Sequence, residues 1–527
     1  MNYVYLSFIV SYCLYIIIKS KKSLHLFQLQ KYNSKNRYFI WLKQDLSRYK
    51  NIDLLFIVIF VLGFVLDSNI ILPLGGVFYL ICAFLENNAQ KKEQVKIPLV
   101  YTARVKRLCV TFAIIYLIPI ILIGLFYKNY LLFILFLLEV FNNIYIILAN
   151  FINKPIEQLV NLYYKNKAIN KLKSMTGLST IGITGSYGKT SSKNILNDVL
   201  NLKYVSFKSP KNLNTPGGLM ITINNHLDKF CEYFIAEMGA CYVGDIKEIC
   251  DLVRPKYGII TRIGVAHMAS FKSQENIQKT KFELIEALPS DGIGILNGDD
   301  PLQLSYKLKN DCKIVWIGID NKDVDVYADN IRLSYLGSTF DVHFKNDDKV
   351  VTFETKLLGY SNIYNILSSI ALGYELGMSI EELQLGVKRV APVEHRLELK
   401  RYTSDIWLID DAYNSNPVGS KMAIDTLGMM PGKKIVVTPG MIEMGELEEK
   451  VNFEFGKQIA EVCDEVILVG KKKTKIIYDA LIDSKYDKEK IHVINDVKES
   501  FRLMEELKDG NTYVLLENDL PDLFNEV

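Results

Sequence analysis

Long apolar runs fill most of the first 150 residues and limit what this part of the chain can fold into. They cover residues 2–18, 53–66, 69–85, 108–126 and 130–150. A helix needs roughly 20 apolar residues to cross the hydrocarbon core of a bilayer, and most of these runs approach that length. The sequence therefore predicts an α-helical membrane region over residues 1–152, with about five transmembrane helices.

Basic residues between these runs predict the orientation of that region. The connections at 19–52 and 86–107 are rich in lysine and arginine, whereas the other two are very short. Such basic loops stay on the cytoplasmic side, so we expect a multi-pass protein of the cytoplasmic membrane with its N-terminus outside. A cleaved signal peptide is the alternative for the first run, but no basic segment precedes it. Residues 153–175 predict a basic linker helix that lies on the bilayer surface and leads into the cytosol.

Charge and cysteine usage exclude several classes of protein. The net charge is only +3 with 23% charged residues, which argues against a nucleic-acid partner. The 8 cysteines form no C-x-x-C pair, which argues against a zinc site or a disulfide framework.

The segment after residue 180 has the pattern of a nucleotide site. The apolar run 180–184 predicts a buried strand, and G-S-Y-G-K-T-S at 185–191 leads into a helix through Leu200. A glycine turn before a helix presents backbone N–H groups to phosphate, and a lysine there adds a cation. The isoleucine at 183 replaces the first glycine of the longer phosphate-loop motif, so a fortuitous glycine turn is the alternative. The candidate nucleotide-binding residues are Gly185, Gly188, Lys189, Thr190 and Ser191.

Short strand-like runs alternate with amphipathic helical stretches from residue 180 onward, which predicts an α/β fold. We expect a central ATP-binding domain with a P-loop-type parallel sheet at 176–395, including strands at 233–237 and 258–263. Further runs at 406–409, 434–437, 465–469, 491–494 and 513–516 predict a Rossmann-like, doubly wound domain at 396–527.

Four more segments accompany the phosphate loop in order. They are A-E-M-G at 236–239, I-G-V-A-H at 263–267 with K-F-E at 281–283, N-G-D-D at 297–300, and D-D-A-Y-N-S-N-P at 410–417. Over residues 175–527 the set resembles the Mur ligases, which form amide bonds with ATP through an acyl-phosphate. The last segment and G-M-I-E-M-G at 440–445 are most similar to the MurF branch, which attaches D-alanyl-D-alanine to UDP-muramyl tripeptide in peptidoglycan synthesis.

The resemblance implies ATP with two Mg²⁺ ions, one held by Thr190 and Glu237. It makes His267 a ligand of the second ion and Lys281 a lysine that CO₂ carbamylates, and it places Arg396 at the γ-phosphate. Asn365 is expected near adenine and Asp411 at the ribose. Taken alone, a single histidine or a helix lysine is more often structural. The residues expected at the substrates are Asn212, Asn214, Thr215, Asn414 and Asn416.

Some positions depart from the family pattern. Ser361 stands where the family has histidine, the loop 212–218 matches only in part, and 516–521 is acidic where a Lys-Gly-Ser turn is usual. The predicted helices also replace the family's UDP-binding domain. The acceptor is therefore either the soluble cell-wall precursor or a lipid-linked or polyglutamate-type one, joined to an amino acid or dipeptide. An inactive membrane scaffold and an ATP-driven transporter are the alternatives from other classes.

Overall fold

The computed structural model describes residues 3–29, 32, 68–92, 98–126, 131–264, 268–334, 337–345, 349–412, 416–442 and 447–518. The chain forms two compact units, Met1–Tyr163 and Tyr164–Val527. The first is helical and the second contains two sheets. Each unit is described separately below.

Helices make up the described part of the first unit. They are α1 (Tyr3–Leu29), α3 (Ser68–Lys92), α4 (Ala103–Phe126), α5 (Leu131–Val140) and α6 (Asn142–Ser174). The predicted apolar run at 53–66 lies outside the described residues. Among the helices that are described, α4 contains one segment, Ala103–Leu122, that is long and apolar enough to cross a membrane, with a mean hydropathy of 2.1. The five-helix membrane region stays a prediction.

Two helix boundaries differ from those expected. The run 130–150 is divided between α5 and α6, with a turn at Phe141. The expected linker helix at 153–175 is the continuation of α6, which runs unbroken from Asn142 to Ser174 and contains Pro155. Inside this unit, Lys19 of α1 forms a buried ion pair with Glu139 of α5. Removing one partner of a buried pair leaves an unpaired buried charge, which is strongly destabilising.

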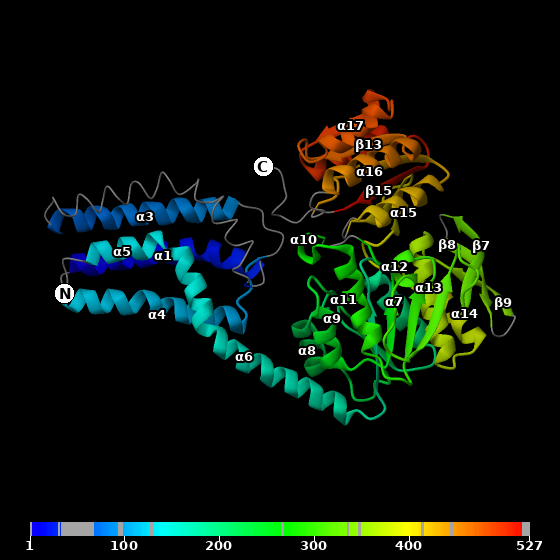
Figure 1. The fold of residues 1–527 in the computed structure, drawn as a ribbon. Coiled ribbons are helices and arrows are strands. Elements are labelled where there is room, and N and C mark those ends of the chain that lie inside the picture. The colour runs from blue at the N-terminus through cyan, green and yellow to red at the C-terminus, as the bar shows by residue number, and fades with distance from the viewer. Residues whose placement is uncertain are drawn as a thin grey trace. The chain divides into compact units, whose positions relative to one another are not determined.

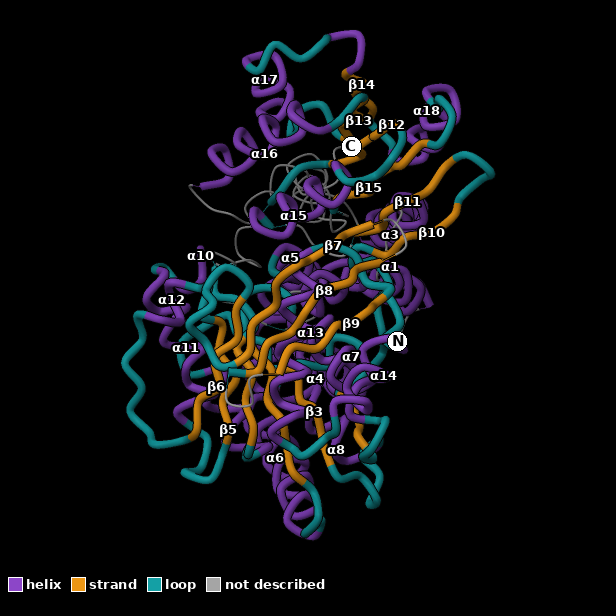
Figure 2. Tube along the Cα trace, turned by 90° about the vertical axis from the view of Figure 1, so that its right-hand side faces the viewer, coloured by secondary structure: helices purple, strands orange, loops and turns teal. Residues whose placement is uncertain are grey.

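A nine-stranded sheet forms the core of the second unit's first domain. Its order is β2-β3-β1-β4-β5-β6-β7-β8-β9, parallel from β2 to β7 and antiparallel from β7 to β9. Figure 2 shows β7, β8 and β9 running side by side. The strands are β1 (Ser179–Thr184), β2 (Ser206–Lys208), β3 (Tyr233–Glu237), β4 (Tyr257–Ile260), β5 (Ile293–Asn297), β6 (Lys313–Gly318), β7 (Val326–Ser334), β8 (Gly337–Phe344) and β9 (Lys349–Thr355).

Helices cover both faces of this sheet (Figure 1). Alternate residues of a strand point to opposite faces. Ile235 of β3 therefore belongs to the apolar cluster that includes residues of α7, α13 and α14, whereas Phe234 and Ala236 belong to the cluster that includes residues of α8, α9 and α11. The helices are α7 (Lys189–Leu200), α8 (Pro216–Asn225), α9 (Asp245–Val253), α10 (Met268–Phe271), α11 (Gln274–Glu286), α12 (Pro301–Leu304), α13 (Tyr360–Glu375) and α14 (Ile380–Arg389).

A six-stranded sheet follows in the order β10-β11-β15-β12-β13-β14. Only β10 is antiparallel to its neighbour among these described strands. One apolar layer lies under α15 and α16 and another under α18, so this sheet is also doubly wound. Its elements are β10 (Glu398–Arg401), β11 (Ile406–Asp411), α15 (Pro417–Gly428), β12 (Lys433–Thr438), α16 (Glu448–Val462), β13 (Glu465–Val469), α17 (Lys475–Asp483), β14 (Ile491–Ile494), α18 (Val497–Leu507) and β15 (Thr512–Glu517).

Candidate active site

The phosphate loop lies between β1 and α7, as the sequence predicts. Gly185 has φ 150° and Gly188 has φ 79°, which are backbone conformations that side chains disfavour. A Cβ atom at Gly185 would also lie 2.0 Å from Thr261 Oγ1. Lys189 donates to the carbonyl oxygens of Gly185 (2.7 Å) and Ser186 (3.2 Å). The loop thus surrounds an ammonium group at the start of a helix, which is a suitable site for phosphate.

Glu237 is the last residue of β3, lies beside this loop, and accepts hydrogen bonds from a hydroxyl and from an amide group. Its Oε1 accepts from Thr190 Oγ1 at 3.2 Å and from Asn214 Nδ2 at 3.1 Å. The carboxylate is 2% exposed. Burial raises its pKa, but ion pairing with Lys193 and the nearby Lys189 hold the pKa below the ordinary value. A partly buried hydroxyl and an ionised carboxylate 3.2 Å apart are hard oxygen ligands, so this pair fits a Mg²⁺ ion.

Lys281 of α11 is buried and is 3% exposed. Burial lowers its pKa to about 7, and the positive charge of Lys189 lowers it further in the same direction. Its ammonium nitrogen lies 5.8 Å from the centre of the Phe271 ring. A neutral amine is therefore present in quantity near neutral pH. His267, expected to be its partner at a second metal ion, lies outside the described residues.

A small cleft next to the phosphate loop is lined by residues of both sheet domains. It is lined by Tyr187, Ser361 and Asn362 among others, and its enclosed volume is about 100 Å³. Asn365 of α13 is 4% exposed, and a Cβ atom on Gly188 would lie 3.0 Å from its Oδ1. Six of the residues predicted to bind nucleotide or substrate line this one cleft. They are Gly188, Ser191, Asn365, Arg396, Asp411 and Asn416.

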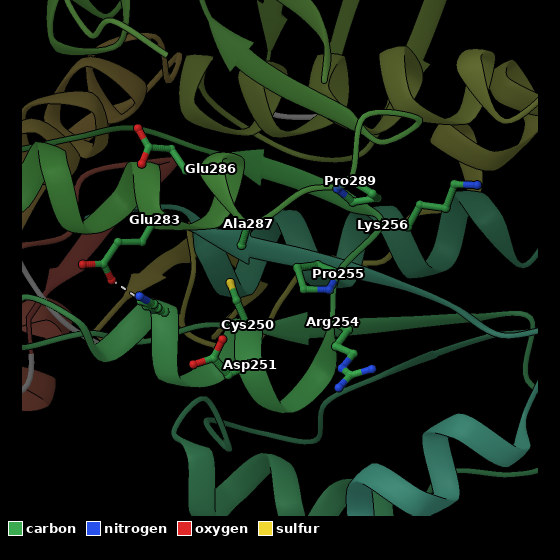
Figure 3. Close-up of a pocket in the computed structure, with 10 residues that line it drawn as sticks. Cys250, Asp251, Arg254, Pro255, Lys256, Glu283, Glu286, Ala287 and Pro289 are labelled. Carbon is green, nitrogen blue, oxygen red and sulfur yellow. Dashed lines mark hydrogen bonds between the residues drawn. The ribbon is translucent and has the colours of Figure 1, made fainter. Parts of the chain in front are cut away.

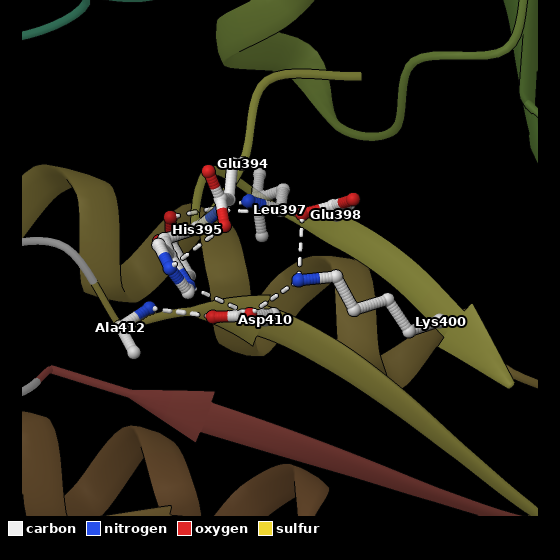
Figure 4. A network of polar contacts seen from close by, with 8 residues as sticks. Glu394, His395, Leu397, Glu398, Lys400, Asp410 and Ala412 are labelled. Carbon is white, nitrogen blue, oxygen red and sulfur yellow. Dashed lines mark hydrogen bonds and ion pairs between the residues drawn. The ribbon is translucent and has the colours of Figure 1, made fainter. Parts of the chain in front are cut away.

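Arg396 lies in the hinge between the two domains, between two residues with positive φ values. Its neighbours His395 and Leu397 have φ values of 59° and 52°. Figure 4 shows how this turn is held: His395 Nδ1 lies 2.8 Å from Asp410 Oδ2, and Lys400 donates to the same oxygen at 2.9 Å. Although burial raises the pKa of Asp410, these hydrogen bonds keep it below its ordinary value. The network was not predicted from the sequence, because it depends on pairing between β10 and β11.

Asp411 follows directly and accepts from the backbone N–H of Leu397 at 3.2 Å. Burial raises the pKa of Asp411 to about 7, against the opposing effect of Arg396. Only the ionised form offers all its oxygens as acceptors to a ribose. We therefore expect ADP to bind about tenfold more tightly at pH 8 than at pH 6. Calorimetric titration checks this, with Asp411→Asn as the control for titration of the phosphates. Equal pH dependence in both proteins would contradict it.

The predicted substrate residues that the structure describes lie near the site, but they form hydrogen bonds within the protein. Asn214 donates to Glu237, and its carbonyl accepts from Gly239 N at 2.8 Å. The Asn212 carbonyl accepts from Asn214 N, and Thr215 caps α8 by accepting from Gly218 N at 3.3 Å. Asn414 lies outside the described residues.

Asn416 caps α15, with its Oδ1 accepting from Gly419 N at 2.8 Å. Asn416→Ala is expected to cost about 1 kcal/mol of stability by loss of that cap. Chemical unfolding of the variant, beside Asn416→Asp, which can still cap, measures the loss. An unchanged midpoint for Asn416→Ala would show that the cap carries no stability.

A larger cavity lies elsewhere, between α9 and α11, with a volume of about 830 Å³. Figure 3 shows Cys250, Arg254 and Glu286 around it, and Glu283 accepting from the backbone N–H of Lys247. None of the predicted site residues lines it. Size alone therefore does not locate the site in this molecule.

Known proteins share both sheet domains. The family model of the Mur ligase middle domain matches residues 183–373, and that of the Mur ligase, glutamate ligase domain matches 395–516. The UDP-N-acetylmuramoyl-tripeptide--D-alanyl-D-alanine ligase of Bacillus subtilis is 32% identical over 334 residues, which are 63% of this chain and 70% of that protein. The ligase of the same name from Escherichia coli is 28% identical, covering 56% of this chain and 65% of its own length.

Solved structures show the same fold. The MurF ligase from Thermotoga maritima in complex with ADP aligns with a TM-score of 0.60 and 24% identity, over 68% of this chain and 80% of that one. MurF from Acinetobacter baumannii aligns with a TM-score of 0.60 and 22% identity, over 68% and 77%. The aligned share is compatible with the two sheet domains, which carry every candidate site residue. From the phosphate loop to the last sheet, this chain belongs to the Mur ligase family.

Proposed function

We propose that this chain is an ATP-dependent ligase that joins D-alanyl-D-alanine to UDP-muramyl tripeptide in peptidoglycan synthesis. The observation that carries the proposal is that the phosphate loop and Arg396 line one cleft, while the loop's Thr190 bonds Glu237 and its Lys189 acts electrostatically on the buried Lys281. The named activity of the Bacillus subtilis relative supports the choice of substrates.

The residues of this site suit formation of an acyl-phosphate from a carboxylate and ATP. The glycine loop and Lys189 bind the phosphates, and Thr190 with Glu237 would hold Mg²⁺, which would neutralise the charge on the transferring oxygens. Arg396, a permanent cation that lines the same cleft, would stabilise the γ-phosphate. Asn365 and Asp411 line the same cleft, where adenosine would bind.

Lys281 supports a finer proposal for a second metal ion. Attack on CO₂ needs a neutral amine, and burial supplies one by lowering the pKa of Lys281 to about 7. The resulting carbamate would carry a negative charge near the cation Lys189. With His267 it would provide ligands for a second Mg²⁺ ion at the acid substrate.

The helical unit supports a proposal about location. Its helices expose many large apolar side chains, among them Leu117 (48%), Ile121 (54%) and Leu122 (51%) of α4. Exposed apolar surface of this extent favours contact with lipid. We infer that this unit anchors the ligase in the cytoplasmic membrane, with the sheet domains in the cytosol and the N-terminus outside. Reconstitution into vesicles and protease protection of the N-terminus test that arrangement.

The direct test uses the full-length protein in detergent. Phosphate release from ATP and Mg²⁺ is followed with UDP-muramyl tripeptide and D-alanyl-D-alanine, with Lys189→Ala as the blank. Release that needs both substrates, with a ligated product of matching mass, is the expected result. ATP binding without release on any of these substrates would overturn the choice of substrates and favour a lipid-linked or polyglutamate-type acceptor.

A further inference from the structure

A second buried lysine, Lys193, lies one helical turn after Lys189 on α7. Its side chain is 2% exposed. Its ammonium nitrogen lies 2.8 Å from Glu237 Oε2 and donates to the carbonyl oxygen of Lys211 at 2.7 Å. A buried ammonium group is costly unless it is paired and hydrogen-bonded, and here both conditions are met. Lys193 thus links the end of β3 to the segment 211–215.

The two oxygens of Glu237 have different neighbours. Oε1 faces Thr190 and Asn214, while Oε2 faces Lys193. A carboxylate oxygen has two lone-pair positions, and both positions of Oε1 have donors near them. A cation that binds between Glu237 and Thr190 therefore competes with the Asn214 amide for Oε1. Lys193 is unaffected by that competition because it uses the other oxygen.

Segment 211–215 depends on this same carboxylate for its position. The Asn214 side chain reaches Glu237, and the Lys211 carbonyl reaches Lys193. If a metal ion displaces the Asn214 amide from Glu237, the hydrogen bond between Lys193 and the Lys211 carbonyl still holds the start of the segment. The segment is also held by the backbone hydrogen bond from Gly239 N to Asn214 O and by the Thr215 cap of α8.

We propose that Lys193 is a positioning residue that holds segment 211–215 in place while Glu237 binds the Mg²⁺ ion of the nucleotide. The inference rests on the proposed function in one respect, namely that segment 211–215 contacts the acid substrate. Lys193 also fixes the Glu237 side chain with Oε1 toward Thr190. The sequence did not single out Lys193, because its two partners are 44 and 18 residues away along the chain.

Hydrogen–deuterium exchange of the full-length protein tests the proposal, with Mg²⁺ and the nonhydrolysable analogue AMP-PNP as the probes. In the wild type, the peptide covering 209–219 should remain protected when Mg²⁺ and AMP-PNP are added. In Lys193→Met, the same addition should speed exchange about tenfold, because the contacts through Asn214 and through Lys193 are then both lost. AMP-PNP with EDTA should not have this effect.

Lys203→Met is the matched control. Lys203 also donates to a backbone carbonyl, that of Gly377 at 2.6 Å, and also pairs with a glutamate, Glu382 at 3.4 Å. It lies after α7 on the surface, so exchange at 209–219 should not change. If Lys193→Met does not fold, Lys193→Gln, which keeps a donor without the charge, is measured in the same way.

Kinetics supply a second measurement. Lys193→Met should raise KM for the acid substrate about tenfold and KM for ATP by less, and Lys193→Arg should restore most of the loss. Faster exchange that is independent of Mg²⁺, or unchanged exchange in a folded variant that binds AMP-PNP, would overturn the role of Lys193 alone. Failure of the wild type to bind AMP-PNP would overturn the proposed function as well.

Discussion

Lys281→Met is expected to make the protein more stable and to abolish ligation. The wild-type lysine is almost fully buried, and its pKa falls from 10.5 to about 7 in the folded state. The lowered pKa means that burying the charged amine costs free energy on folding. Methionine has a similar length and no charge, so the substitution removes this cost. We expect a gain of about 2–4 kcal/mol at pH 7, seen as a rise of roughly 5 °C or more in apparent melting temperature.

The gain should depend on pH in one direction. Between pH 7 and 10.5 the unfolded chain binds a proton at this lysine that the folded chain does not. Wild-type stability therefore rises with pH across this window, and the advantage of the methionine variant shrinks toward zero. Added bicarbonate should stabilise the wild type, because carbamylation replaces the ammonium by an anion, and it should leave the variant unchanged.

Lys279→Met is the control for this experiment, since Lys279 lies exposed on the same helix α11. It should change neither the melting temperature nor the activity appreciably. A loss of stability in Lys281→Met would mean that the folded protein stabilises the ammonium form instead. Ligation by the methionine variant at the wild-type rate would exclude any role for Lys281 at the reacting groups.

The parallel strands that surround the site were predictable, because each is a short apolar run. The predicted strand at 233–237 is β3, and the predicted run 180–184 falls within β1. Strands in the middle of a doubly wound sheet are covered on both faces, so their sequences are apolar throughout. The phosphate loop was predictable for a related reason, since its glycines adopt conformations that other residues disfavour.

The antiparallel strands β7 to β9 were not predicted. They lie toward one edge of the sheet, and polar residues such as Asp329, His343 and Thr352 alternate with their buried residues. The alternation weakens the apolar signal on which the other predictions depended. The continuous helix α6 was missed for another reason: no glycine or cap separates its apolar part from its basic part, so composition changes where the backbone does not.

Contacts between distant segments account for the rest of what the sequence did not reveal. Lys193 looks like an ordinary helix lysine until β3 places Glu237 beside it. Thr215 and Asn416, predicted at substrate, cap helices in the structure. Helix N-caps and substrate contacts use the same short polar side chains, so the residue type alone does not distinguish the two roles.

Lys189→Ala is expected to lower kcat/KM by about 10²–10³, the loss typical of removing one group that stabilises charge in a transition state. Its ammonium group sits inside the phosphate loop, hydrogen-bonded to Gly185 and Ser186 carbonyls. Phosphate release with both substrates present measures the loss. Lys189→Arg should not restore activity, because a planar, longer guanidinium does not fit a loop that closes around a compact point charge.

The same substitution should also change Lys281. The charge of Lys189 is the second cause, after burial, of the low pKa of Lys281. Without it, the Lys281 amine should become neutral only at higher pH, so the stabilising effect of bicarbonate should move to higher pH in Lys189→Ala. A bicarbonate response at unchanged pH would show that burial alone sets the pKa of Lys281. A shifted response would mean that the phosphate loop prepares the buried lysine for CO₂ as well as binding the nucleotide, so one cation would serve both halves of the site.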